Sequence, residues 1–178
     1  MATMPPHQPT AKFTEVFEVD TFPSATGLVG YKLGGQWEIK RLLHTGPQQS
    51  GGNFGVGYVV YDERNKLERF LKVVDFRKRL SDPSKLAQLL NEAQFEVDIH
   101  RYCGERRMSK VVQMVSHGDL IFKRRSDGEE YSFICILMER GEGDIKNHVD
   151  YAPNQSPYWK LCVGACQATC RLIHAANR

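Results

Sequence analysis

The stretch SGGNFGVGYVVYDERNKLERFLKVVDF, residues 50–76, decides the fold that we expect. It opens with a glycine-rich turn over residues 50–57, followed by a strand-like run at 58–61. A polar turn at 62–69 then leads into a second strand-like run at 70–76. The alternation of turn and apolar segments predicts a hairpin of two strands behind a glycine-rich loop.

Lys72 lies inside the second apolar run. A lysine in an apolar strand costs free energy unless an anionic group meets it. Glycines let backbone N–H groups approach a phosphate closely because they carry no Cβ. A lysine on the next strand can reach the same phosphates, so the stretch indicates a nucleotide site.

Two other nucleotide signatures do not fit this stretch. A Walker loop needs lysine after G-x-x-x-x-G, and Tyr58 stands there after Gly52 and Gly57. A dinucleotide turn needs G-x-G-x-x-G between a strand and a helix. Gly55 and Gly57 begin that pattern, but Val60 replaces its third glycine.

The stretch resembles the protein-kinase family, whose pattern is G-x-G-x-x-G-x-V followed by a strand lysine in a V-A-I-K-like run. Ser50, Gly52 and Gly55 take the three glycine positions. Phe54 takes the loop tip and Lys72 the strand lysine. TGPQQSGGNFGVGY and the FLKVVDF run are most similar to bacterial serine/threonine-type kinases.

Two positions depart from the kinase pattern. Gly57 stands at the valine position and Phe70 at the alanine position, both of which line the adenine slot in that family. The ring of Phe70 either offsets the missing bulk at Gly57, or it fills the slot and obstructs the nucleotide. We favour retained binding, because the glycines and Lys72 would otherwise have no evident purpose.

A helix is expected after residue 80. Ser81 or Asp82 can cap it, and Pro83 suits its first turn. Its inward stripe recurs at three- and four-residue steps: Leu86, Leu89, Ala93, Glu96 and His100.

Kinases pair one glutamate of this helix with the strand lysine. Glu96 lies on the inward stripe and is the candidate that we favour, with Glu92 as its rival. Alternatively, both are ordinary surface glutamates. We predict an ion pair between Lys72 and Glu96.

Residues 131–138, YSFICILM, predict a buried strand. By resemblance, Met138 is the gatekeeper at its end, and Glu139 and Gly141 offer hinge backbone groups to adenine. Asp144 falls near the ribose. A plain loop with Asp144 capping the next helix explains the same residues.

The resemblance covers residues 37–178 and implies ATP as ligand, with magnesium as the family's metal. The implied ATP-binding residues are Ser50, Gly51, Gly52, Asn53, Phe54, Gly55, Gly57, Phe70, Lys72, Glu96, Met138, Glu139, Gly141 and Asp144. H-R-D-x-x-x-x-N and D-F-G, which supply the catalytic aspartate and the magnesium ligands, do not occur in the sequence. We therefore expect an incomplete kinase domain with no catalytic residue or metal ligand of its own.

The expected fold class is α+β. Residues 1–30 are predicted to form a mobile tail with strand-like pieces near 13–19. Residues 31–138 are predicted to form a kinase-like N-lobe, a twisted antiparallel sheet with one long helix. Residues 139–178 are expected to form the hinge and the start of a helical C-lobe.

Two function classes stay open. One is a protein kinase that transfers the γ-phosphoryl group of ATP to Ser/Thr of proteins, present here as its ATP-binding portion. The other is a non-catalytic, pseudokinase-like nucleotide-binding or regulatory module. The expected partners are ATP and either a protein substrate or the missing C-lobe.

Composition sets further bounds. A net charge of +3 in 178 residues is too small to imply nucleic acid. The sequence contains no apolar run of membrane-spanning length and no secretory signal pattern. The five cysteines are an odd number, and free thiols in a reducing cytoplasm are expected.

Overall fold

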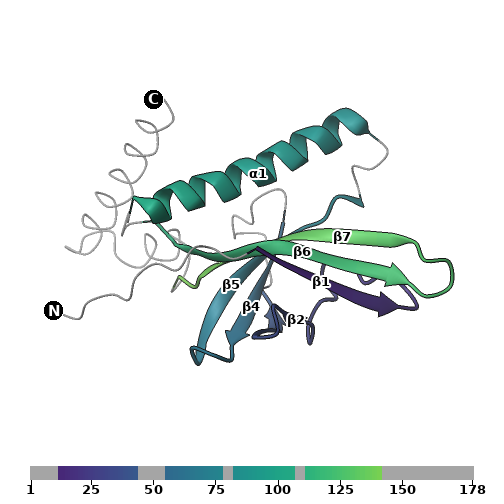
Figure 1. Ribbon diagram of the computed structural model, residues 1–178, viewed down its shortest axis with the longest axis horizontal. Helices are drawn as coiled ribbons and strands as arrows, with labels where there is room; N and C mark the ends of the chain where they lie inside the picture. The colour runs from purple at the N-terminus through teal and green to yellow at the C-terminus, as the bar shows by residue number, and fades with distance from the viewer. Residues whose placement is uncertain (1–11, 44–54, 78–81, 107–110, 142–178) are drawn as a thin grey trace, which may run out of the picture.

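The structure, a computed structural model, describes residues 12–43, 55–77, 82–106 and 111–141. Within them, the chain is a mixed α+β protein in which a seven-stranded sheet carries one long helix (Figure 1). The elements are β1 (Lys12–Val19), β2 (Lys32–Leu33), β3 (Trp37–Leu42), β4 (Val56–Asp62), β5 (Leu67–Val74), α1 (Pro83–Glu105), β6 (Met114–Arg124) and β7 (Glu130–Glu139).

The strands follow the order β1-β6-β7-β5-β4-β3-β2. Every neighbouring pair is antiparallel except β1 and β6, which are parallel over eight residue pairs. The antiparallel sheet that was predicted for residues 31–138 is confirmed for the strands within that range, and the parallel strand β1 comes from the segment that was predicted to be a tail. Gly118 permits the parallel contact, because a Cβ there would lie 2.1 Å from the Phe13 carbonyl oxygen.

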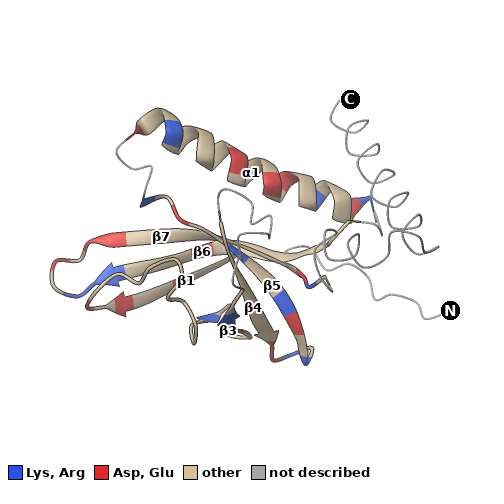
Figure 2. Ribbon diagram, turned by 180° about the vertical axis from the view of Figure 1, so that it is seen from behind, with Lys and Arg blue, Asp and Glu red and all other residues tan. Residues whose placement is uncertain are grey.

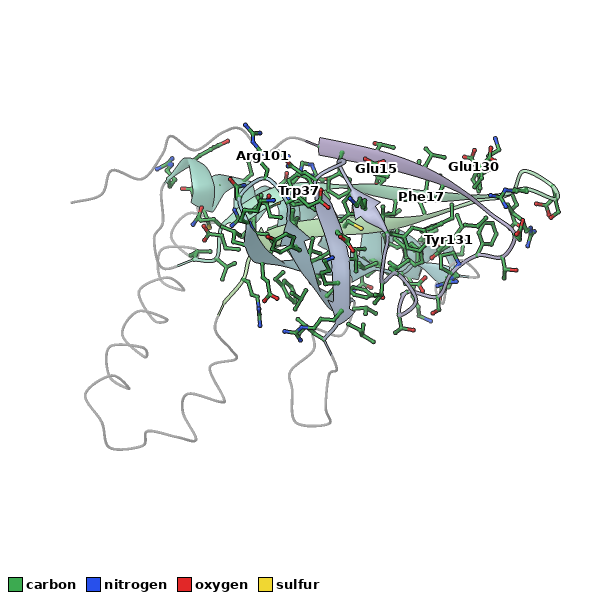
Figure 3. The ribbon with its side chains drawn as sticks, turned by 90° about the horizontal axis from the view of Figure 1, so that it is seen from below. Glu15, Phe17, Trp37, Arg101, Glu130 and Tyr131 are labelled. Carbon is green, nitrogen blue, oxygen red and sulfur yellow. The ribbon has the colours of Figure 1, made fainter. Side chains whose placement is uncertain are left out.

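Residues 12–30, which were predicted to belong to a mobile tail, contribute a strand and buried core residues, and residues 1–11 lie outside the described part of the chain. Strand β1 includes the strand-like pieces expected near residues 13–19. Phe13 is buried and its ring centroid lies 6.0 Å from that of Trp37, while the ring centroid of Phe17 lies 4.9 Å from that of Tyr31. Figure 3 labels Phe17 of β1 and Trp37 of β3. Burial of these rings holds the segment in the domain.

Those ring contacts join β1 to residues near β2 and β3, at the opposite end of the strand order, so the sheet is curled. Its inner face encloses the main hydrophobic core. That core includes Leu28, Leu33, Ile39, Tyr58, Val60, Leu71, Val73, Leu120, Phe122, Phe133, Cys135 and Leu137. Such a closed interior provides most of the apolar burial in the domain.

Helix α1 crosses the opposite face of the sheet (Figure 1). Asp82 is its N-cap and accepts a hydrogen bond from the Lys85 backbone N–H at 3.2 Å, and Pro83 stands in the first turn, as predicted. Two small clusters bury the helix against the sheet. Leu89 packs with Val74 and Phe76, and Val97 packs with Met114, Ile136 and Met138.

Strand β5 begins at Leu67, three residues before the predicted run. The fully buried Asp62 explains the difference, because it closes a tight turn by accepting the Arg64 and Asn65 backbone N–H groups and the Asn65 amide. Burial alone would raise the pKa of Asp62, but the hydrogen bonds from Asn65 and the charge of Arg69 lower it.

No helix in the described residues is both long enough and apolar enough to cross a membrane.

Candidate functional site

Sheet register brings four of the predicted site residues to the face covered by α1. Gly57 pairs with Lys72 across β4 and β5, and Phe70 pairs with Met138 across β5 and β7. Lys72 and Phe70 are two residues apart, so both side chains point to the same side of β5. Figure 2 shows acidic residues gathered along the middle of α1 above this face.

The predicted ion pair is confirmed: Lys72 Nζ lies 2.6 Å from Glu96 Oε2. The rival, Glu92, instead accepts a hydrogen bond from the Gln88 side chain at 2.7 Å. Ala93 and Val97 are buried against the sheet, and this orientation of α1 directs Glu96 toward β5.

The ion pair is only partly shielded, with 21% of the Lys72 side chain and 29% of the Glu96 side chain exposed. Such pairs contribute about 0–1 kcal/mol to stability. The pair nevertheless fixes the position of the ammonium group. An ammonium has three donors, and among the described residues Lys72 Nζ has one hydrogen-bond partner, Glu96.

Gly55, the last residue of the kinase-like glycine pattern, lies directly against Lys72. A Cβ at position 55 would be 3.0 Å from both Cγ and Cε of Lys72 and 3.1 Å from the Val73 carbonyl oxygen. Any side chain there would displace the lysine or the strand. The end of the glycine-rich stretch and the strand lysine are thus neighbours.

The ring of Phe70 lies beside Gly57. A Cβ on Gly57 would be 3.0 Å from Cε2 and 3.3 Å from Cζ of Phe70. The half-buried ring also packs against the cluster that contains Met138 and Val97. The ring therefore occupies the space that a side chain at position 57 would need.

Met138 is 7% exposed and belongs to that same cluster. Strand β7 ends at Glu139, whose backbone N–H donates to the Gln113 carbonyl at 2.9 Å. The Glu139 N–H therefore has a partner inside the protein. The hinge prediction assigned the Glu139 carbonyl to adenine, and this hydrogen bond does not involve that carbonyl. Gly141 is exposed.

Six predicted site residues fall outside the described residues: Ser50, Gly51, Gly52, Asn53, Phe54 and Asp144. The predicted C-lobe start, residues 142–178, lies outside them as well. In the described ranges, no three His, Cys, Asp or Glu side chains are grouped to hold a metal ion.

His100 lies one helical turn beyond Glu96, at the same edge of the site. Its Nδ1 is 3.2 Å from the Val112 carbonyl oxygen. Burial lowers the pKa of His100 and the nearby Lys72 lowers it further, while Glu96 and the Val112 carbonyl raise it. The sequence placed His100 on the inward stripe but gave it no role in the site.

A polar cluster at the rim of the inner core was not predicted. The Asp75 carboxylate accepts hydrogen bonds from the Arg77 guanidinium, at 2.8 Å, and from the Tyr131 hydroxyl. Arg77 also donates to the Pro23 carbonyl at 2.9 Å and lies 4.8 Å from the centre of the Tyr131 ring. The cluster fastens the segment before β2 to the sheet, and only the local Asp75–Arg77 spacing hinted at it.

Comparison with known proteins does not identify a family for this chain. No protein-family model matches the chain, and no curated protein is detectably similar to it.

Proposed function

We propose that this chain is the nucleotide-binding lobe of a protein-kinase-like protein and binds ATP on the face covered by α1. The observation that carries the proposal is the 2.6 Å contact between Lys72 and Glu96. A helix glutamate that positions a strand lysine for phosphate is the arrangement that protein kinases use.

The order of the elements supports this proposal. The glycine-rich residues connect β3 to β4, which are antiparallel neighbours in the sheet. Strand β5 comes next and carries Lys72, and α1 follows with Glu96. The contact of Gly55 with the Lys72 side chain brings the glycine-rich stretch to the same point.

The described residues suit a phosphate better than a metal ion. Lys72 offers ammonium donors beside a glycine backbone, whereas the described part of the chain contains no group of metal-ligand side chains. Our proposal for these residues is therefore nucleotide binding and phosphate positioning. Transfer to Ser/Thr would require an H-R-D-type loop and a D-F-G motif, which the 178 residues do not contain.

A second candidate function is a non-catalytic regulatory module that binds a nucleotide or a protein partner. The placement of Phe70 against Gly57 favours it, because this pair replaces the small apolar residues of an active kinase.

Isothermal titration calorimetry with ATP in magnesium buffer tests the proposed function. We expect Lys72→Met and Glu96→Gln to weaken ATP binding, the first by about tenfold or more, because a charge-assisted hydrogen bond is lost. Glu92→Gln is the matched control on the same helix and should bind as wild type. Equal affinity in the wild type and Lys72→Met, or no binding by the wild type, would contradict the proposal.

A further inference from the structure

Strand β1 lies at one end of the seven-stranded sheet, beside β6 (Figure 1). Within the described residues, no strand pairs with its second edge, since β2, at the other end of the order, is two residues long and pairs with β3. Strand β1 runs for eight residues without a proline or a register shift. Natural proteins usually interrupt such an edge, because its backbone groups can pair with another chain.

Two contacts show which backbone groups of β1 point to the second edge. The Val19 carbonyl accepts the Arg125 N–H at 2.9 Å, and the Phe13 carbonyl oxygen lies against Gly118 of β6. The odd-numbered residues of β1 therefore direct their backbone groups to β6. Because these directions alternate along a strand, the even-numbered residues in 12–18 direct their N–H and C=O groups to the second edge.

The side chains of the same even-numbered residues form an exposed row on the outer face of the sheet. Lys12 and Glu18 have 60% and 70% of their side chains exposed, and Val16, between them, is 58% exposed. Phe13 and Phe17 instead pack into the inner core. Val16 is therefore an exposed apolar side chain at the centre of an edge strand, where a second strand would cover it.

The two ends of β1 carry opposite charges. Lys12 begins the strand, whereas Glu18 and Asp20 are at its end, where Arg125 lies 3.7 Å from the Glu18 carboxylate, 3.4 Å from the Glu18 carbonyl and 3.1 Å from the Asp20 carboxylate. Lys12 also lies 3.1 Å from Asp119. Exposed ion pairs such as these contribute little, so a change of partner costs little. The strand is therefore complementary in charge to a copy of itself that runs antiparallel.

We propose that β1 is a dimerisation edge, at which two copies of this chain pair antiparallel about a two-fold axis and form one continuous sheet. The backbone directions and charges select the register with the axis at Val16. This register sets Val16 opposite Val16 of the second copy and Lys12 opposite Asp20 of the second copy. An axis at Glu15 would oppose two like charges, and an axis at Thr14 would set Lys12 opposite Val16.

Sedimentation velocity of the full chain over the micromolar range tests the proposal by charge reversal. We expect the wild type to dimerise, and Lys12→Glu and Asp20→Lys each to weaken the dimer about tenfold or more, because each change opposes like charges twice. The double variant Lys12→Glu/Asp20→Lys restores opposite charges across the axis and should dimerise nearly as the wild type does. Lys85→Glu is the matched control, since the Lys85 side chain is 59% exposed on α1.

The double variant separates association from folding. Within one chain it keeps both new repulsions, between Glu at position 12 and Asp119 and between Lys at position 20 and Arg125. Damage to the fold would therefore be at least as large in the double variant as in either single variant. Recovery of the dimer in the double variant can come only from contacts between two chains, and far-ultraviolet circular dichroism shows that each variant is folded.

Oxidative cross-linking tests the register. Residues opposed in a hydrogen-bonded antiparallel pair have Cα atoms about 5.5 Å apart, which is within the range of a disulfide. Val16→Cys should therefore form covalent dimers with oxygen as the oxidant. Thr14→Cys is the control, because the two copies of residue 14 would lie about 13 Å apart along the strands. The wild type, which has five cysteines, sets the background.

Each of four outcomes would overturn the inference. These are a monomeric wild type at every concentration, a dimer that both single charge reversals leave intact, no recovery in the double variant, and cross-linking of Thr14→Cys in preference to Val16→Cys. Assemblies that keep growing with concentration would indicate open-ended aggregation and would overturn it as well. Strand β1 contributes none of the residues proposed to bind ATP, so ATP binding by a monomeric chain would leave the proposed function standing.

Discussion

The two faces of the curled sheet are buried in different ways. The inner face is a continuous core of aromatic and aliphatic side chains drawn from β1 to β7. The face under α1 has two small apolar clusters, and between them lie the half-buried Lys72 and Glu96, with His100 one helical turn beyond Glu96. The inner face therefore supplies stability, whereas the helix face can hold charged groups where a ligand can reach them.

The two faces also differ in how far apart in the sequence their residues lie. The inner core recruits Phe13 and Phe17 from β1, far away in sequence from β6. The helix face is built from residues 55–138 alone. The candidate site therefore uses residues from one continuous part of the chain, whereas the core also requires strand β1.

The largest effect is expected on the inner face, at Phe122. This ring is fully buried and contacts Tyr31 at 5.1 Å and Phe133 at 5.8 Å between centroids. Phe122→Ala should lower the free energy of unfolding by about 3–5 kcal/mol in a urea titration. Phe95→Ala on the outside of α1 should change it by about 0.5 kcal/mol or less. Similar losses in both would show that the inner face is not the stabilising one.

A smaller effect is expected at Tyr58, also on the inner face. Its hydroxyl donates to the Ala25 carbonyl at 2.5 Å and accepts from the Leu28 N–H at 3.2 Å. Tyr58→Phe should cost about 1–3 kcal/mol, because two buried backbone groups lose their partner. Tyr61→Phe, on the opposite face of the same strand, is the control. A larger loss at position 61 would reverse the proposed contrast between the faces.

The rim of the inner core should respond to pH through Asp75. Burial opposes its charge, but hydrogen bonds from Arg77 and Tyr131 hold its pKa below the ordinary value. A lowered folded pKa stabilises the protein above about pH 3.9, and that contribution is lost as pH falls through the folded pKa. Asp75→Asn should therefore be less stable than wild type near pH 7, by about 1 kcal/mol.

Thermal unfolding across this pH range measures the Asp75 effect. The difference between wild type and Asp75→Asn should shrink below about pH 4. Asp20→Asn, whose side chain is 82% exposed beside Arg125, is the control and should show a much smaller change. A difference between wild type and Asp75→Asn that does not depend on pH would contradict the role given to the carboxylate.

The sequence predicted the helix face better than the inner face, for a physical reason. Lys72, the helix cap and Glu96 follow from short-range spacing, since strand and helix periodicities decide which side chains share a face. The parallel pairing of β1 with β6 joins residues about a hundred positions apart, and no local pattern encodes it. The Asp75–Arg77–Tyr131 cluster was missed because Tyr131 and Pro23 join it only through the curl of the sheet.

Boundary errors have a similar origin. The polar residues Glu68 and Arg69 suggested a turn. They instead belong to β5, where their side chains point to opposite faces of the sheet, because Asp62 closes the turn earlier in the chain. The sequence already showed that Gly57 and Phe70 stand at the valine and alanine positions of the kinase pattern. Only the β4–β5 register shows that the ring covers the glycine.

The most direct test of the account is chemical labelling of Lys72 with an ATP derivative that carries an acyl group on its terminal phosphate. If the phosphates lie at Lys72, its amine attacks the acyl carbon, an amide forms and ATP leaves. Peptide mass spectrometry should then find the acyl group on Lys72, and excess ATP should suppress it. The exposed Lys32 and Lys123 should show only weak labelling that ATP does not change. An unmodified Lys72, or labelling of all three lysines that is insensitive to ATP, would contradict the central claim that this face binds a nucleotide.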